Sequence, residues 1–138
     1  MENNHREEVL RRVFDLVNSW LKQNADPETP VNNYQAPDQL KKELGLKIEE
    51  AGIKDQELVE EVEKYLKFSV KTSHPAYLNQ LFGGFNFPAF IGEVITALTN
   101  TSMYTYEVAP VATLMEMQLI EKMLGYTGWN SGTGAMMT

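Results

Sequence analysis

Two short segments hold the residues of this chain best suited to chemistry. Residues 74–81 read HPAYLNQL and residues 100–110 read NTSMYTYEVAP. Both combine hydroxyls, amides and aromatic rings, and Glu107 is their one carboxylate. Burying a polar group without a partner costs free energy, so this mixture suits a ligand site better than a plain core. We therefore expect both segments to line a binding pocket.

Other kinds of active site have little support in the sequence. The chain has no cysteine, and His5 and His74 are its two histidines, which leaves little for a catalytic triad or a zinc site. The residues 132–134, GTG, are too short for a dinucleotide-binding fingerprint. We expect neither bound metal nor disulfide and thiolate chemistry.

Charge is distributed unevenly along the chain. The sequence has 19 acidic and 12 basic residues, and of these residues 72–138 hold only Glu93, Glu107, Glu116, Glu121 and Lys122. A domain surface is commonly about 25–35% charged. We expect this half to be covered by more protein, either a partner subunit or other parts of the same polypeptide; the alternative is an exposed surface built from Asn, Ser, Thr and Tyr.

Composition and charge also indicate which partners and which cellular location the chain has. The net charge of −7, without clustered Lys and Arg, argues against a nucleic-acid partner. The amino terminus lacks the order of a signal peptide, and no window approaches the roughly 20 apolar residues of a membrane span. We expect a soluble, cytoplasmic protein without membrane association.

The first half is predicted to begin with a helix and a linker. Apolar residues recur at helical spacing from Val9 to Leu21, in a helix that Asn4 caps and that continues to about Gln23. Three prolines then mark residues 24–37 as an extended linker. Because the apolar stripe is wide and the linker gives reach, we expect this helix to dock on another subunit rather than fold back on its own chain.

Four shorter predictions complete the elements. A short helix begins at Pro37 and stops at Gly45. Another is capped by Asp55, with its acidic face in water and with an inward face formed by Leu58, Val59, Val62, Tyr65 and Leu66. Residues 90–98 are predicted to be helical, and a last helix begins at Pro110 and ends before Gly125. No strand pattern is convincing, so the chain is predicted to be mainly α.

The two polar segments also resemble a known family. Their usual forms in the glutamate decarboxylase-like branch of the pyridoxal-phosphate-dependent group II decarboxylases are HPRFFNQL and NTSMYTYEIAPV, and the resemblance extends over roughly residues 55–138. Aromatic amino-acid decarboxylases carry different sequences at both places. This chain departs from the family at Ala76, which replaces the usual Arg, and at Thr133, which replaces the Asp of Gly-Asp-Gly.

The resemblance implies a fold and a division of the chain. It makes the chain the N-terminal helical segment of an α/β fold type I pyridoxal-phosphate enzyme, similar to aspartate aminotransferase and homodimeric when whole. Residues 1–54 would form a helical arm and linker. Residues 55–138 would lead into the cofactor-binding large domain and end just before its phosphate turn.

The resemblance also implies roles for single residues. Gln80 would contact the distal acid group of a small acidic amino acid (glutamate, aspartate or cysteine sulfinate), and Ser102 and Tyr104 would shape the same pocket. Thr138 would adjoin the phosphate turn of the cofactor site. The simpler alternatives are a surface or capping amide for Gln80 and a packing role for Tyr104.

Catalysis needs groups that this chain does not offer. A pyridoxal-phosphate enzyme requires a lysine for the Schiff base and an acid at the pyridine nitrogen. Lys122 is the single lysine of the half that is poor in charge, and it follows Glu121 on a predicted helix, which favours a surface position. We expect no catalytic residue here and no activity from the chain alone. The rival function is a non-catalytic helical interaction or dimerisation module.

Overall fold

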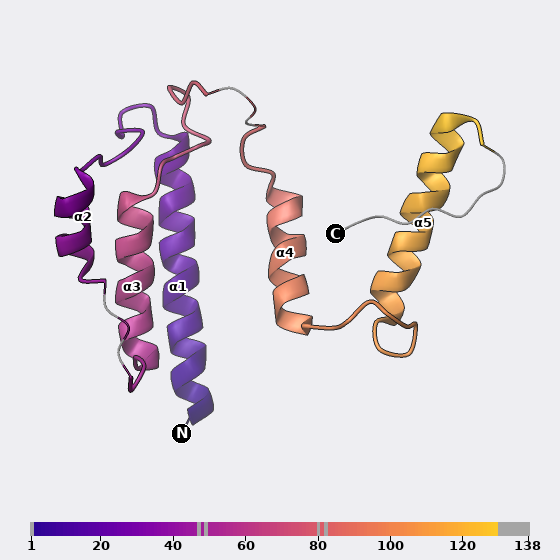
Figure 1. The fold of residues 1–138 in the computed structure, drawn as a ribbon, viewed down its shortest axis with the longest axis horizontal. Helices are drawn as coiled ribbons and strands as arrows, with labels where there is room; N and C mark the ends of the chain where they lie inside the picture. The colour runs from indigo at the N-terminus through magenta and orange to yellow at the C-terminus, as the bar shows by residue number, and fades with distance from the viewer. Residues whose placement is uncertain (1, 47, 49, 80, 82, 130–138) are drawn as a thin grey trace. The chain divides into compact units, whose positions relative to one another are not determined.

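The described part of the chain consists of helices joined by loops. The computed structural model describes residues 2–46, 48, 50–79, 81 and 83–129, and within these ranges it contains helices and no strand (Figure 1). The helices are α1 (Glu2–Ala25), α2 (Pro37–Leu44), α3 (Asp55–Phe68), α4 (Phe87–Thr99) and α5 (Pro110–Thr127). The mainly α prediction is confirmed. The chain divides into two compact units, residues 1–85 and 86–138. The separate division into an arm of residues 1–54 and a segment of residues 55–138 stays a prediction.

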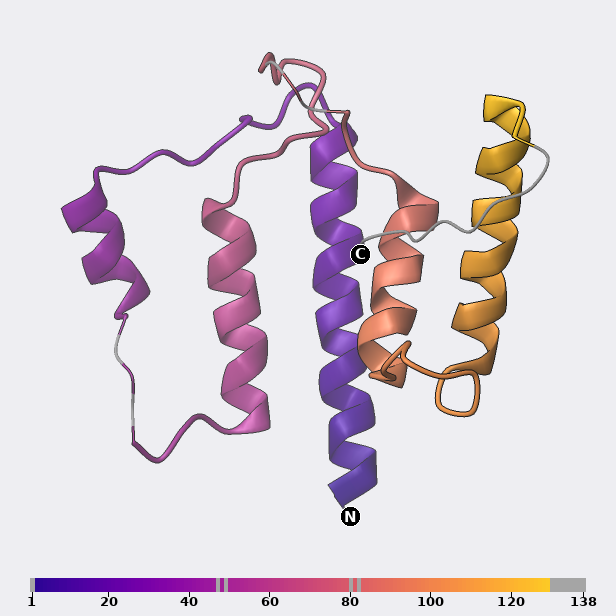
Figure 2. The ribbon, with the colours of Figure 1, turned by 45° about the vertical axis from the view of Figure 1, so that its right-hand side comes forward.

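The first helix packs against its own chain, so the prediction that it would not fold back is wrong. Figures 1 and 2 show α1 and α3 side by side. Val9 on α1 and Val59 on α3 are buried. The indole Nε1–H of Trp20 donates to the carbonyl of Leu66 at 3.2 Å, near the end of α3. Part of the apolar stripe of α1 thus packs on α3 within the same unit, whereas Leu10 and Phe14 stay exposed.

Hydrogen bonds hold the loop after α1 in place. The helix continues to Ala25, beyond the predicted end, and it begins at Glu2, so Asn4 lies inside it instead of capping it. The hydroxyl of Thr29 donates to the carbonyl of Gln23 at 2.6 Å and to that of Asp26 at 2.9 Å. The loop therefore returns the chain towards α3 and does not extend α1 away from it.

Helix α2 has the predicted ends and is joined to α3 by an exposed ion pair. Pro37 lies in its first turn, and Gly45, with φ of 59°, caps it in the left-handed region that glycine tolerates. Lys67 Nζ lies 2.8 Å from Glu43 Oε1, and Gln35 Nε2 donates to Glu43 Oε2 at 2.7 Å. Both bonds lower the pKa of the Glu43 carboxyl, and the bond from Lys67 has the larger effect.

Helix α3 differs from its prediction in its cap and in part of its apolar face. Asp55 is its first residue, not its cap, and the carboxylate of Glu57 accepts the backbone N–H of Lys54 at 3.0 Å. Val59 is buried as predicted, whereas Leu58 and Tyr65, predicted to face inward, are exposed. The reason is that α1 covers one side of α3 only.

The second unit leaves its apolar side chains exposed. Helix α4 starts three residues before its predicted start, where Asn86 Oδ1 accepts the N–H of Ala89 at 2.9 Å, and α5 continues through Gly125 to a left-handed cap at Gly128. Among its described residues Ala109 alone is buried. The exposed apolar residues include Ile91, Ile95, Leu98, Val111, Leu114, Met115, Leu119 and Met123. This exposure agrees with the expectation that more protein covers this half.

Replacing Trp20 by Phe is expected to destabilise the first unit by about 1 kcal/mol, since the ring still packs but its hydrogen bond to Leu66 is lost. The melting temperature followed by circular dichroism should fall by about 4–8 °C, as for a unit of this size. Trp129→Phe is the matched control, because Trp129 is exposed in the second unit. Equal shifts in the two variants would contradict this role.

Candidate functional site

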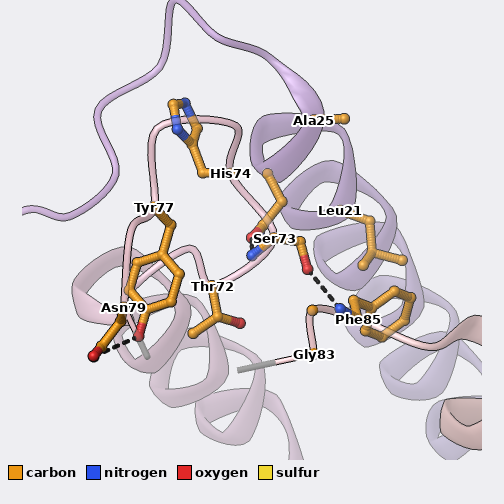
Figure 3. A pocket seen from close by; sticks show the side chains of 11 residues that line it. Leu21, Ala25, Thr72, Ser73, His74, Tyr77, Asn79, Gly83 and Phe85 are labelled. Atoms are coloured by element: carbon orange, nitrogen blue, oxygen red, sulfur yellow. Dashed lines mark hydrogen bonds between the residues drawn. The ribbon is translucent and has the colours of Figure 1, made fainter. Parts of the chain in front are cut away.

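The first polar segment belongs to a loop that is closed at its base. The backbone N–H of Phe85 donates to the hydroxyl of Ser73 at 2.9 Å, which joins the two ends of residues 73–85 (Figure 3). A pocket of about 470 Å³ lies between this loop and the C-terminal turns of α1, where Leu21 and Asn24 contribute to its wall. The helix end and the loop therefore form one concave surface within the first unit.

His74 at the start of this loop uses both ring nitrogens for structure. Its side chain is 5% exposed. The N–H of Ala76 donates to Nδ1 at 3.1 Å, and Nε2 lies 3.0 Å from the carbonyl oxygen of Asp26. A neutral imidazole has one donor and one acceptor, so these partners assign the proton to Nε2. His74 is thus an anchor for the loop, and neither nitrogen is left to act as a base.

The pocket wall farther along the loop is polar. Asn79 Nδ2 donates to the hydroxyl of Tyr77 at 3.2 Å, and both side chains line the pocket (Figure 3). Gln80, the predicted contact for the substrate's distal acid group, lies outside the described residues. Thr138, the residue predicted to adjoin the phosphate turn, also lies outside them.

The second polar segment forms turns between α4 and α5. Ser102 is exposed, and Tyr104 is 94% exposed, so neither belongs to a core formed by the described residues. These side chains are accessible to a ligand or to further protein. Since Gln80 is not described, the convergence of Gln80, Ser102 and Tyr104 stays a prediction.

Glu107, the carboxylate of this second segment, is hydrogen-bonded within its own turn. Its own backbone N–H, and then the hydroxyl of Thr105, lower its pKa. The backbone N–H of Ala109 donates to the carbonyl of Thr105 at 3.1 Å. These bonds organise the turn that leads into α5, and they favour an ionised Glu107 that supports the turn.

Two buried polar residues next to the pocket were not predicted. Asn24 and Lys71 are 2% and 6% exposed. Asn24 continues the apolar stripe of α1 four residues after Trp20, so a polar residue on an apolar face was the available signal. Lys71 follows the acidic α3 and has no comparable signal in the sequence.

Comparison with known proteins places the chain in a family. A family model described as the pyridoxal-dependent decarboxylase conserved domain matches residues 37–136. The chain belongs to this family of pyridoxal-dependent decarboxylases.

Particular relatives show which branch it resembles. The chain is 37% identical over 129 residues to cysteine sulfinic acid decarboxylase of Rattus norvegicus, covering 93% of this chain and 26% of that protein. It is 37% identical over 125 residues to glutamate decarboxylase of Drosophila melanogaster, covering 91% and 24%. It is 39% identical over 119 residues to acidic amino acid decarboxylase GADL1 of Xenopus tropicalis, covering 86% and 23%. The chain thus spans about a quarter of the length of these curated relatives.

A solved structure agrees with the predicted fold. The crystal structure of mouse CSAD matches with a TM-score of 0.87 and 35% sequence identity, covering 96% of this chain and 28% of that one. That enzyme has the fold type I architecture, so the prediction of a helical segment from such an enzyme is confirmed.

Family membership implies pyridoxal phosphate as the cofactor, and the described residues do not fit it by themselves. The ammonium of Lys71 is engaged, since it donates to the carbonyl of Pro30 at 3.1 Å. Lys122 is exposed, with its ammonium 5.0 Å from the ring centre of Tyr126. The ammonium of Lys71 bonds to the protein and that of Lys122 lies at the surface, so we assign no reaction step to either lysine.

The 138-residue chain alone is expected not to retain pyridoxal phosphate, because the described part of the chain presents no lysine suited to a Schiff base. After incubation with the cofactor and gel filtration, the protein should show no visible absorption from the cofactor. Borohydride treatment should leave its mass unchanged. A stoichiometric adduct on Lys71 or Lys122 would contradict the expectation.

Proposed function

We propose that this chain is the N-terminal part of a pyridoxal-phosphate-dependent decarboxylase for a small acidic amino acid, namely glutamate, aspartate or cysteine sulfinate. The observation that carries the proposal is the set of relatives. Cysteine sulfinic acid decarboxylase, glutamate decarboxylase and an acidic amino acid decarboxylase all match most of this chain at similar identity. Their names share one substrate class, an amino acid with a second acid group.

In this proposal the chain recognises the substrate, while residues outside it do the covalent work. Gln80 donates hydrogen bonds from its amide to the distal acid group, and Ser102 and Tyr104 set the size and polarity of the same pocket. The exposure of Ser102 and Tyr104 supports this role, because both are available to a ligand. Thr138 adjoins the phosphate of the cofactor.

The complete enzyme is proposed to be a cytoplasmic homodimer. The exposed apolar side chains of α4 and α5 support burial against further protein. On α1, Leu10 and Phe14 are also exposed, although the helix packs on α3. Sedimentation of the complete polypeptide tests the dimer, and cell fractionation tests the location. Within the described part of the chain, no helix combines the length and apolar character needed to cross a membrane.

Carbon dioxide release by the complete polypeptide tests the proposed activity. The protein is supplied with pyridoxal phosphate and given glutamate, aspartate, cysteine sulfinate or an aromatic amino acid. Release from at least one acidic substrate that depends on the cofactor, and little from the aromatic one, is expected. A dimer that binds the cofactor weakly and releases no carbon dioxide from any of them would favour the non-catalytic dimerisation module instead.

Ser102→Asn is expected to change the ranking of the three acidic substrates, because a larger amide at this position alters the space and the donors around the acid group. Specificity constants for glutamate, aspartate and cysteine sulfinate should be measured side by side in the complete enzyme. Ser19→Asn is a control on the exposed surface of α1. If the ranking is the same in both variants, Ser102 does not shape the pocket.

A further inference from the structure

Three buried polar side chains connect the end of α1 and the loop after it to the segment that follows α3. Asn24, Lys71 and His74 are the buried polar or charged residues among those that the structure describes. Buried polar groups are tolerated when they are hydrogen-bonded, and such groups then specify one arrangement of the chain. We call these three residues the latch.

The first part of the latch joins residues 71 and 73 to α1 and its loop. The carboxamide oxygen of Asn24 lies 3.4 Å from the backbone nitrogen of Ser73, which donates to it. The ammonium of Lys71 donates to the carbonyl of Pro30 at 3.1 Å, and its backbone N–H donates to that of Val31 at 2.9 Å. Both sides of this junction lie in the first unit.

The second part of the latch is the imidazole of His74, which bridges two segments. Nε2 donates to the carbonyl of Asp26 in the loop after α1, and Nδ1 accepts the N–H of Ala76 in the pocket loop. The backbone carbonyl of His74 also accepts the N–H of Tyr77 at 2.9 Å. One side chain therefore connects the loop after α1 to the turn that begins the pocket loop.

The latch acts at the base of the loop that carries Gln80 in the sequence. Ser73 is bonded to Asn24 through its backbone and to Phe85 through its hydroxyl, so the same residue holds both ends of the loop.

We propose that Asn24, Lys71 and His74 are positioning residues that make the placement of the 73–85 loop depend on the end of α1. This inference rests on the proposed function, because it gives the N-terminal arm an influence on substrate affinity. The arm then contributes to recognition of the acid group through the loop, without touching the substrate.

Two substitutions of His74 separate its two hydrogen bonds. In His74→Asn the amide oxygen can replace Nδ1 and still accept from Ala76, but the bond to Asp26 is lost. In His74→Gln the amide nitrogen can replace Nε2 and still donate to Asp26, so the loop remains tied to the arm. His5→Gln, at the other histidine, is the matched control.

Steady-state kinetics of the complete enzyme test the proposal. His74→Asn should raise the KM for the acidic substrate about tenfold, the equivalent of one lost hydrogen bond, and leave kcat within about twofold. His74→Gln should restore most of the affinity, and His5→Gln should match the wild type. A loss confined to kcat, or equal KM values in both His74 variants, would overturn the proposal.

Hydrogen exchange tests the latch independently of activity. In His74→Asn the backbone amides of residues 74–77 should exchange faster, while those in the middle of α3 keep their protection. Unchanged exchange in residues 74–77 would overturn the latch even if the enzyme is active, whereas faster exchange in an inactive protein would uphold the latch and reject the proposed function.

Lys71→Met provides a second variant in case His74→Asn fails to fold. It keeps the apolar stem but removes the bond to the Pro30 carbonyl, so it should reproduce the rise in KM and the faster exchange at residues 71–77. Lys41→Met, on the exposed surface of α2, is its control. If Lys71→Met folds and behaves like Lys41→Met, the proposal is wrong.

Discussion

Replacing Val59 by Asp is expected to destabilise the first unit strongly. Val59 is 3% exposed, at the face of α3 that packs on α1. A carboxylate buried there without a partner costs several kcal/mol, about 3–5. Since small domains have a total stability of about 5–15 kcal/mol, this cost removes a large part of the stability of the unit and should lower its urea midpoint markedly.

The matched control for this variant is the neighbouring residue. Leu58 is 44% exposed, so Leu58→Asp places the same charge on the same helix in contact with water. Urea unfolding of both variants, followed by circular dichroism, compares the two sites. If Leu58→Asp and Val59→Asp destabilise the protein equally, the α1–α3 packing described here is incorrect.

Replacing Gln80 by Ala is expected to lower kcat/KM for the acidic substrate in the complete enzyme by about 1–3 kcal/mol equivalent. This is the usual effect of leaving a buried polar partner without its hydrogen bond, here the acid group of the substrate. The melting temperature should change little.

An exposed glutamine on α2 provides the control for the Gln80 variant. Gln39→Ala should keep the kinetics of the wild type. If Gln80→Ala keeps those kinetics but melts at a much lower temperature, Gln80 is structural and its assignment to the acid group fails.

Local signals predicted the helices well. The helix boundaries predicted at Pro37, Gly45 and Pro110 are confirmed, because proline fits a first turn and glycine tolerates the left-handed cap. Gly125 was read wrongly as a stop, since a glycine within a helix is tolerated when the helix continues on both sides, here to the cap at Gly128.

The arrangement of the helices depended on contacts that local signals do not contain. The wide stripe of α1 indicated that it must dock, but it did not identify α3 as the partner. The bonds that return the chain, such as Thr29 to Gln23 and Trp20 to Leu66, join residues whose pairing has no sequence pattern. Contacts of this kind become visible only in three dimensions.

The site was predicted from resemblance and only partly from the residues. A high content of polar groups with a single carboxylate identified both segments, and the shared role of Gln80, Ser102 and Tyr104 stays a prediction. The latch was missed, because the role of His74 depends on a carbonyl 48 residues away in the sequence, at Asp26. A lone histidine in a sequence does not reveal such a partner.

Discrimination between an acid and its amide tests the central claim most directly. In the complete enzyme, kcat/KM should be measured for glutamate against glutamine and for aspartate against asparagine. We predict a preference for at least one acid over its amide of about tenfold or more, because Gln80, Ser102 and Tyr104 are proposed to bind a second acid group. Equal and measurable rates for acid and amide in both pairs, or a preference for the amide, would contradict the account.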